Sequence, residues 1–123
     1  MKILVIDDDA AVRKFISITL KKENYTVFEA DNGKTGLQIL QQEHDISVMI
    51  TDLIMPEMEG IETIIEVKKK YPAIKILAIS GGGKVSPENY LVLANVLGAN
   101  NTLKKPFSGQ ELIKVIGNLE NGC

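Results

Sequence analysis

Short runs of β-branched and other apolar residues alternate with amphipathic stretches along the whole chain. This alternation is typical of repeated strand–helix units whose strands form one parallel sheet. Central runs such as ILVI, VMI and ILAI are apolar without interruption, which indicates strands covered on both faces by helices. We expect five strands, at residues 2–6, 25–29, 47–51, 75–79 and 101–104. The sequence therefore predicts a doubly wound α/β fold built on a five-stranded parallel sheet.

The expected helices are bounded by residues that start or stop helices. Asp9 can cap the first helix, Ser86 and Pro87 can open the fourth, and Gly98 can end it. We expect helices at 10–22, after the turn 31–33, from Gly60 to the KKK run before Pro72, at 86–98 and from Ser108 onward. The side chains expected to face inward on the first helix are Val12, Phe15, Ile16, Thr19 and Leu20.

The composition limits the classes of protein to which the chain can belong. Its 123 residues fit one domain, with 45% hydrophobic residues, 24% charged residues and a net charge of −2. That balance is typical of a soluble globular protein and lacks the basic excess that nucleic-acid binding needs. No apolar run reaches membrane-spanning length, the N-terminal segment is not a signal peptide, and Cys123 is the single cysteine. We expect a cytoplasmic protein that binds neither nucleic acid nor membrane.

Polar residues follow the expected strands where each strand ends. Asp7 and Asp8 follow the first strand, Asp52 ends the third, Ser80 the fourth and Lys105 the fifth. The carboxyl ends of parallel strands meet at one edge of a sheet, so these side chains should lie together. Neighbouring carboxylates repel and raise one another's pKa, and a cluster that stays ionised indicates a hard cation. The sequence predicts Mg²⁺ at this edge.

The same residues suit the transfer of a phosphoryl group. Asp52 could attack phosphorus, while Mg²⁺, the Lys105 ammonium and the Ser80 hydroxyl each contact a different phosphoryl oxygen. Such a reaction needs correct positioning and neutralised charge more than covalent machinery.

Four segments resemble the receiver domains of two-component response regulators. They are ILVIDDD, DLIMPEMEG, AISGGG and KKPF, and they span nearly the whole chain. The resemblance implies that Asp52 is the phosphoacceptor. It also implies that Asp8, Asp52 and the main-chain carbonyl of Ile54 bind Mg²⁺, while Asp7 orients a coordinated water.

The resemblance further assigns the residues that contact the phosphate. Ser80 would bind it through its hydroxyl. A cis peptide bond before Pro106 would direct Lys105 inward. We expect the Lys105 ammonium to contact only the phosphate-bearing state.

Two positions depart from the family pattern. Thr102 stands three residues before Lys105, where receivers commonly carry an aromatic side chain that moves on phosphorylation. Ile54, two residues after Asp52, cannot hydrogen-bond a hydrolytic water. Because Thr102 moves less surface than an aromatic side chain, we expect the signal to depend more on the loop 81–85 and on the fourth helix.

Two other functions compete with the receiver hypothesis. A phosphatase of the haloacid-dehalogenase type would use Asp7 as nucleophile and Asp9 as general acid, but the acids expected after its lysine motif are missing. A flavodoxin-like flavin protein would place its phosphate against three aspartates, which repel an anion. The string GKT at 33–35 lacks the first glycine of a phosphate-binding loop, since Phe28 occupies that position.

The sequence leads to one prediction of function. The fold is expected to be flavodoxin-like, with strand order 2-1-3-4-5, and residues 1–123 to form a single receiver domain without an effector domain. A histidine kinase or histidine phosphotransfer protein would phosphorylate Asp52. The domain would catalyse its own phosphotransfer and dephosphorylation, without being a turnover enzyme. Output would pass to a protein target through the fourth helix, strand five and helix five, with Val92 and Val96 on the exposed face of the fourth helix.

Overall fold

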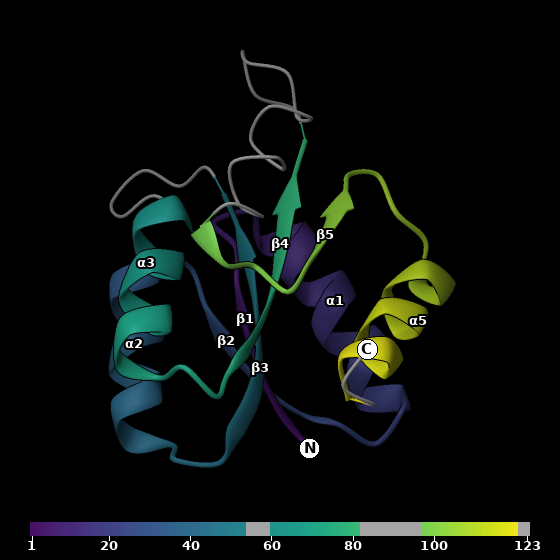
Figure 1. Ribbon diagram of the computed structural model, residues 1–123. Helices are drawn as coiled ribbons and strands as arrows, with labels where there is room; N and C mark the ends of the chain where they lie inside the picture. The colour runs from purple at the N-terminus through teal and green to yellow at the C-terminus, as the bar shows by residue number, and fades with distance from the viewer. Residues whose placement is uncertain (54–59, 82–96, 121–123) are drawn as a thin grey trace.

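The computed structural model describes residues 1–53, 60–81 and 97–120 (Figure 1). Within these ranges the chain forms five strands and four helices. The strands are β1 (Lys2–Ile6), β2 (Thr26–Ala30), β3 (Ile46–Asp52), β4 (Lys75–Ser80) and β5 (Asn101–Lys104). The helices are α1 (Ala10–Lys22), α2 (Gly33–Gln42), α3 (Gly60–Lys70) and α5 (Gly109–Glu120).

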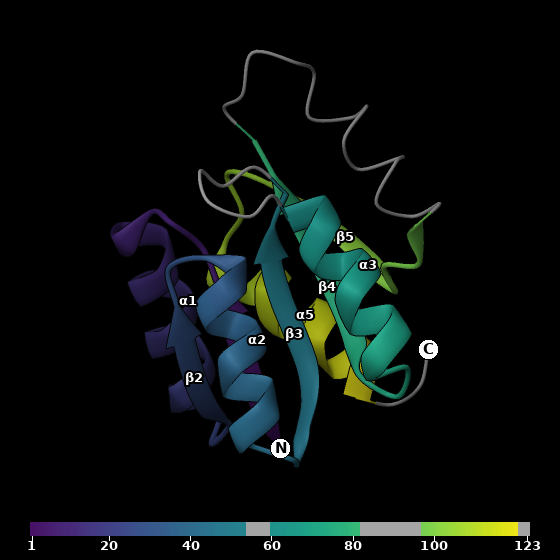
Figure 2. The ribbon, with the colours of Figure 1, turned by 90° about the vertical axis from the view of Figure 1, so that its left-hand side faces the viewer.

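All five strands are parallel and lie in the order β2-β1-β3-β4-β5. This confirms the predicted doubly wound fold and strand order. Helices α2 and α3 cover one face of the sheet, and α1 and α5 cover the other (Figures 1 and 2). None of the helices in the described ranges is long and apolar enough to cross a membrane.

The sheet is buried on both faces, as its uninterrupted apolar runs predict. Alternate residues of β1 enter different clusters: Leu4 and Ile6 pack with Leu40 beneath α2 and α3, while Ile3 and Val5 pack with Ile16 beneath α1 and α5. This division follows from the two-residue period of a strand. The sheet is therefore packed on both faces, and its strand ends set where the following residues begin.

The element boundaries differ from the sequence prediction by one or two residues. Strand β2 begins and ends one residue later than predicted, and β3 and β4 extend to Asp52 and Ser80. Gly33, expected in a turn, is the first residue of α2, because Asn32 caps the helix by accepting a hydrogen bond from Thr35 N at 2.8 Å. Most of the expected fourth helix lies outside the described residues. Leu97 is helical and Gly98 has a φ of +110°, which agrees with the predicted stop.

The inward face of α1 was predicted in part wrongly. Ile16 and Leu20 are buried as expected, and Val12 is half-buried. Phe15, however, is 42% exposed. Ser17, and not Phe15, is buried on the inner side of the helix. Its hydroxyl has no hydrogen-bond partner among the described residues. The difference has a physical reason: Phe15 lies against Phe107 at the edge of the domain, at a centroid distance of 6.1 Å, and not under the sheet.

Candidate functional site

The register of the sheet brings the acids of two strands together. Ile6 of β1 pairs with Thr51 of β3, so the next residues, Asp7 and Asp52, lie side by side. One carboxylate oxygen from each of Asp7, Asp8 and Asp52 lies within 4.8 Å of the others. Asp7 and Asp52 are buried, while Asp8 is exposed. The predicted cluster of acids is therefore present, with an open side at Asp8.

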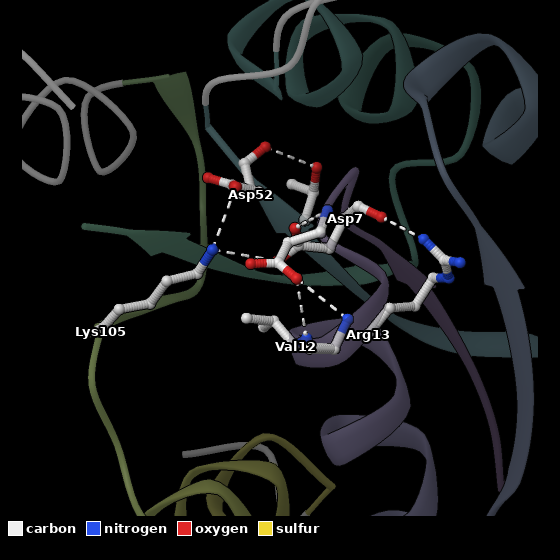
Figure 3. Close-up of polar contacts among 8 residues, drawn as sticks. Asp7, Val12, Arg13, Asp52 and Lys105 are labelled. Atoms are coloured by element: carbon white, nitrogen blue, oxygen red, sulfur yellow. Dashed lines mark hydrogen bonds and ion pairs between the residues drawn. The ribbon is translucent and has the colours of Figure 1, made fainter. Parts of the chain in front are cut away.

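Lys105 reaches the acids from the loop after β5. Its Nζ lies 3.2 Å from Asp52 Oδ2, to which it donates a hydrogen bond, and 3.2 Å from Asp7 Oδ2 (Figure 3). This arrangement corrects one prediction. The ammonium was expected to contact only the phosphate-bearing state, yet it is paired with the carboxylates of Asp52 and Asp7. The reason is electrostatic, since clustered carboxylates attract the nearest flexible cation.

Burial and charge act in opposite directions on the two buried groups. Burial raises the pKa of Asp7 above 3.8, and Asp52 adds repulsion, although the amide of Asp9 and the Lys105 ammonium pull in the other direction. Burial alone lowers the pKa of Lys105, but the attraction of Asp52 and Asp7 outweighs it and raises the pKa above 10.5. The site thus holds a charged lysine and a carboxylate that is costly to ionise.

The loop after β1 is fixed by hydrogen bonds. Asp9 caps α1 as predicted, since its Oδ1 accepts from Ala11 N at 2.9 Å. The Asp7 side chain accepts a hydrogen bond from Asp9 N at 2.9 Å, and its main-chain carbonyl accepts one from Arg13 Nη1 at 2.8 Å. Arg13 was not among the residues predicted for the site. Its place one turn after the Asp9 cap could have suggested a contact with the acidic loop.

The start of α3 packs against the main chain at Asp52. Gly60 N donates to Leu53 O at 3.0 Å, and a Cβ on Gly60 would overlap the main-chain carbonyl of Asp52. Thr51, fully buried, donates from Oγ1 to the same carbonyl at 3.0 Å. The main chain at Asp52 therefore has little freedom to move. Ile54, predicted to offer its carbonyl to a metal, lies outside the described residues.

Ser80 and Lys105 are joined through the main chain. Lys105 N donates to Ser80 O at 2.9 Å, and a Cβ on Gly81 would lie 2.6 Å from Lys105 Cβ. Ser80 is 1% exposed and lies one residue past Ile79, the register partner of Asp52. The peptide bond between Lys105 and Pro106 is cis, as the sequence predicts. The four strand ends thus place Asp7, Asp52, Ser80 and Lys105 at one edge of the sheet.

An apolar hollow lies beside the Lys105 side chain. It has a volume of about 550 Å³ and opens between the start of α1 and the loop that leads into α5. Its lining includes Val12, Phe15, Gly81, Lys105, Pro106 and Phe107. The exposure of Phe15 is explained by its position in this lining.

Comparison with known proteins identifies the family. The model of the response regulator receiver domain matches residues 3–117. A chemotaxis protein CheY homolog of Campylobacter jejuni is 37% identical over 116 residues, which are 91% of this chain and 86% of that protein. A probable transcriptional regulatory protein of Picosynechococcus is also 37% identical, but the match covers 46% of its length.

Solved structures agree with this assignment. A receiver domain protein from Clostridium thermocellum has a TM-score of 0.88 at 33% identity, and the match covers 98% of this chain and 94% of that one. The chemotaxis protein CheY4 of Vibrio cholerae has a TM-score of 0.85 at 31% identity, with 95% and 96% covered. The chain belongs to the receiver domains of response regulators, which act as phosphorylation-dependent switches in two-component signalling.

Proposed function

We propose that Asp52 is the residue that accepts the phosphoryl group. The observation that carries the proposal is the position of the Lys105 ammonium, 3.2 Å from an oxygen of Asp52 and 3.2 Å from one of Asp7. A cation at this point can neutralise the charge that builds up when a phosphoryl group approaches Asp52. Asp7 makes a poorer nucleophile, because burial disfavours its ionised form.

The acids also fit a Mg²⁺ ion. Asp7, Asp8 and Asp52 offer three hard oxygen ligands within 4.8 Å of one another, and Asp7 Oδ2 is buried with the Lys105 ammonium 3.2 Å away. A hard dication with several waters suits such a set. Asp8 and Asp52 would hold it directly, Asp7 would act through a water, and the carbonyl of Ile54 remains a predicted fourth ligand. When bound, the ion would supply positive charge that neutralises phosphoryl oxygens.

The transfer itself requires one bond to form and one to break. A carboxylate oxygen of Asp52 bonds to phosphorus as the phosphorus–nitrogen bond to a donor imidazole breaks, and the imidazole nitrogen keeps the electron pair. The Lys105 ammonium exchanges its carboxylate contacts for a phosphoryl oxygen, and the Ser80 hydroxyl donates a hydrogen bond to another. Attack by water on the acyl phosphate restores Asp52. The domain promotes both steps on itself, so it is a switch and not a turnover enzyme.

The donor would be a histidine kinase or a histidine phosphotransfer protein. The apolar hollow beside Lys105 offers such a partner a docking surface next to the acceptor, and Phe15, which is 42% exposed, lies at its edge. Large exposed apolar side chains that cluster beside a site are typical of protein contacts.

The output surface is proposed on β5, α5 and the predicted fourth helix, most of which lies outside the described residues. Thr102, on β5, is half-buried and pairs in register with Ala78 of β4. This small side chain therefore lies close to the strand that carries Ser80. Val92 and Val96 lie outside the described residues. Changing both to Asp should leave phosphorylation intact and abolish phosphorylation-dependent association with a target or a second copy. Undiminished association in light scattering would place the output surface elsewhere.

Two broader predictions remain part of the proposal. A receiver domain over most of the chain is supported by the family model, which matches residues 3–117. A cytoplasmic location is supported by the single cysteine, which fits a reducing compartment. The alternative of a haloacid-dehalogenase-type phosphatase with Asp7 as nucleophile has no support from the family comparisons.

The acceptor can be tested with a small acyl phosphate as donor. Incubation with Mg²⁺ and acetyl phosphate should add one phosphoryl group to the protein, seen by intact mass, and Asp52→Asn should prevent the addition. Asp31→Asn is the matched control, because Asp31 follows β2 at the same edge of the sheet but is exposed and outside the acid cluster. Equal labelling of the parent and the Asp52→Asn variant would overturn the proposal.

A further inference from the structure

Asp7 is held from three directions. Its amide donates to Ala30 O at 3.1 Å, and its Oδ1 accepts from Asp9 N at 2.9 Å. Its main-chain carbonyl accepts the 2.8 Å hydrogen bond from Arg13 Nη1. Figure 3 shows Asp7 between Lys105, on the side of its carboxylate, and Arg13, on the side of its carbonyl. Of the three hydrogen bonds named above, the one from Arg13 comes from a long, charged side chain.

The Arg13 guanidinium is fixed at a second point. Its Nε lies 3.3 Å from Glu29 Oε1 and donates a hydrogen bond to it. Glu29 lies on β2, where it pairs in register with Val5 of β1, two residues before Asp7. The two side chains are 21% and 27% exposed, so the pair is partly shielded from water. The fork of the guanidinium therefore ties the loop after β1 to the edge strand of the sheet.

The acid cluster needs such support. Asp7 and Asp8 are consecutive residues, and their carboxylates repel each other and Asp52. Repulsion favours any loop movement that separates them. A hydrogen bond from a charged donor to the Asp7 carbonyl is stronger than a neutral one and opposes that movement. Partners behind metal ligands often set the orientation of those ligands.

We propose that Arg13 is a positioning residue of the acid cluster. Held by Glu29, it fixes the main chain at Asp7, so that Asp7 and Asp8 present their carboxylates to the cation. The inference rests on the proposed Mg²⁺ site and adds to it two residues, one of them on an edge strand that carries no part of the site.

Because Arg13 is positively charged, the direction in which its removal changes Mg²⁺ affinity tests the inference. A positive charge near a cation site weakens cation binding, so removal of Arg13 would tighten Mg²⁺ binding if charge alone mattered. If Arg13 positions the acids, its removal loosens them and weakens Mg²⁺ binding. The two explanations therefore predict opposite changes in the same quantity.

The experiment is a calorimetric titration of the full chain with Mg²⁺ for parent, Arg13→Ala and Lys14→Ala. Lys14 is the matched control, because it is the next residue of α1, has the same charge and is exposed. We expect the dissociation constant of Arg13→Ala to rise about tenfold. That of Lys14→Ala should stay unchanged or fall slightly. Affinity in Arg13→Ala equal to or tighter than in Lys14→Ala would overturn the inference.

Two further variants separate positioning from loss of folding. Arg13→Lys keeps the charge and can reach one partner but not both, so its affinity should fall between those of the parent and Arg13→Ala. Glu29→Gln should weaken binding less than Arg13→Ala, and the two changes combined should be less than additive. Urea unfolding in a chelator identifies any variant that fails to fold. If Arg13→Ala fails to fold, an Arg13→Lys variant that binds Mg²⁺ as tightly as the parent would overturn the inference.

The same titration distinguishes this inference from the proposed function. A folded parent that binds no Mg²⁺ would overturn the metal site and the role of Arg13 together. A parent that binds Mg²⁺, with an Arg13→Ala variant that binds it equally well, would overturn the role of Arg13 alone.

Discussion

The ammonium of Lys105 donates a hydrogen bond to Asp52 Oδ2 over 3.2 Å. The two residues come from the ends of strands that are not neighbours, since β4 lies between β3 and β5. The lysine therefore crosses the end of β4 to reach the proposed acceptor. On the proposed function, phosphorylation of Asp52 would replace this ion pair with a contact to a phosphoryl oxygen. A switch of this kind starts from a defined resting arrangement.

Removal of Lys105 should destabilise the metal-free protein. Lys105→Ala leaves the buried carboxylates of Asp7 and Asp52 without their shared cation, and we expect the free energy of unfolding to fall by about 2 to 4 kcal/mol. Urea unfolding in a chelator measures the loss. Added Mg²⁺ should recover part of it, because it binds the same carboxylates. The exposed Lys114 provides the control Lys114→Ala, and equal losses in the two variants would contradict the account.

Asp7→Asn should have the opposite effect on stability. Burial makes the ionised form of Asp7 costly, so a neutral amide of the same shape should raise the free energy of unfolding near pH 7 when no metal is present. Each pKa unit by which the carboxyl is raised corresponds to about 1.4 kcal/mol. The same change should weaken Mg²⁺ binding. If Asp7→Asn is less thermally stable than the parent in chelator, the ion pair with Lys105 outweighs the cost of burying the Asp7 carboxylate.

Two glycine-to-alanine changes should shift the free energy of unfolding in opposite directions. Gly60→Ala places a Cβ against the main-chain carbonyl of Asp52, which cannot rotate away, and we expect a loss of more than about 2 kcal/mol together with slower phosphorylation. Gly117→Ala places a Cβ in open space within α5 and should stabilise the protein by about 0.5 to 1 kcal/mol. Thermal unfolding of both variants measures the contrast. A similar change in the two would argue against close packing at Asp52.

Tyr25 should ionise at a higher pH than an ordinary tyrosine. Burial and the 2.8 Å hydrogen bond to Glu120 Oε2 raise its pKa from 10.0 to about 12. Because the folded pKa lies above the unfolded one, this group's contribution to stability is fully present below pH 10 and is lost as the pH rises through 12. An absorbance titration of tyrosinate should show one late step that Tyr25→Phe removes. Persistence of that step in Tyr25→Phe would contradict the assignment.

The sequence predicted which residues meet at one edge of the sheet because strand ends are strongly patterned. Apolar runs that stop at Asp7, Asp52 and Ser80 indicate both the strands and the edge at which they end, and the order of a doubly wound sheet then brings the residues together. The span of β5 matched residue by residue, and so did that of α1, where the Asp9 cap marks the start. Such local patterns predict the folded arrangement because the sheet determines which way the residues at its strand ends face.

Features that depend on side-chain geometry could not be predicted in this way. The reach of Lys105 to two carboxylates depends on where a flexible side chain finds opposite charge. The hydrogen bond from Arg13 to the Asp7 carbonyl leaves no pattern in the sequence, since its acceptor is main chain. The reversal of Phe15 and Ser17 on α1 reflects packing at the edge of the domain, where helical period alone does not decide burial.

The identity of the phosphorylated residue is the most direct test of the account. The protein is incubated with Mg²⁺ and acetyl phosphate, reduced with borohydride, which converts an acyl phosphate of aspartate to homoserine, and mapped by peptide mass spectrometry. The account predicts homoserine at position 52 and unchanged residues at Asp7, Asp8 and Asp9. Homoserine at Asp7, or at none of the aspartates while the intact mass shows a phosphoryl group, would contradict it.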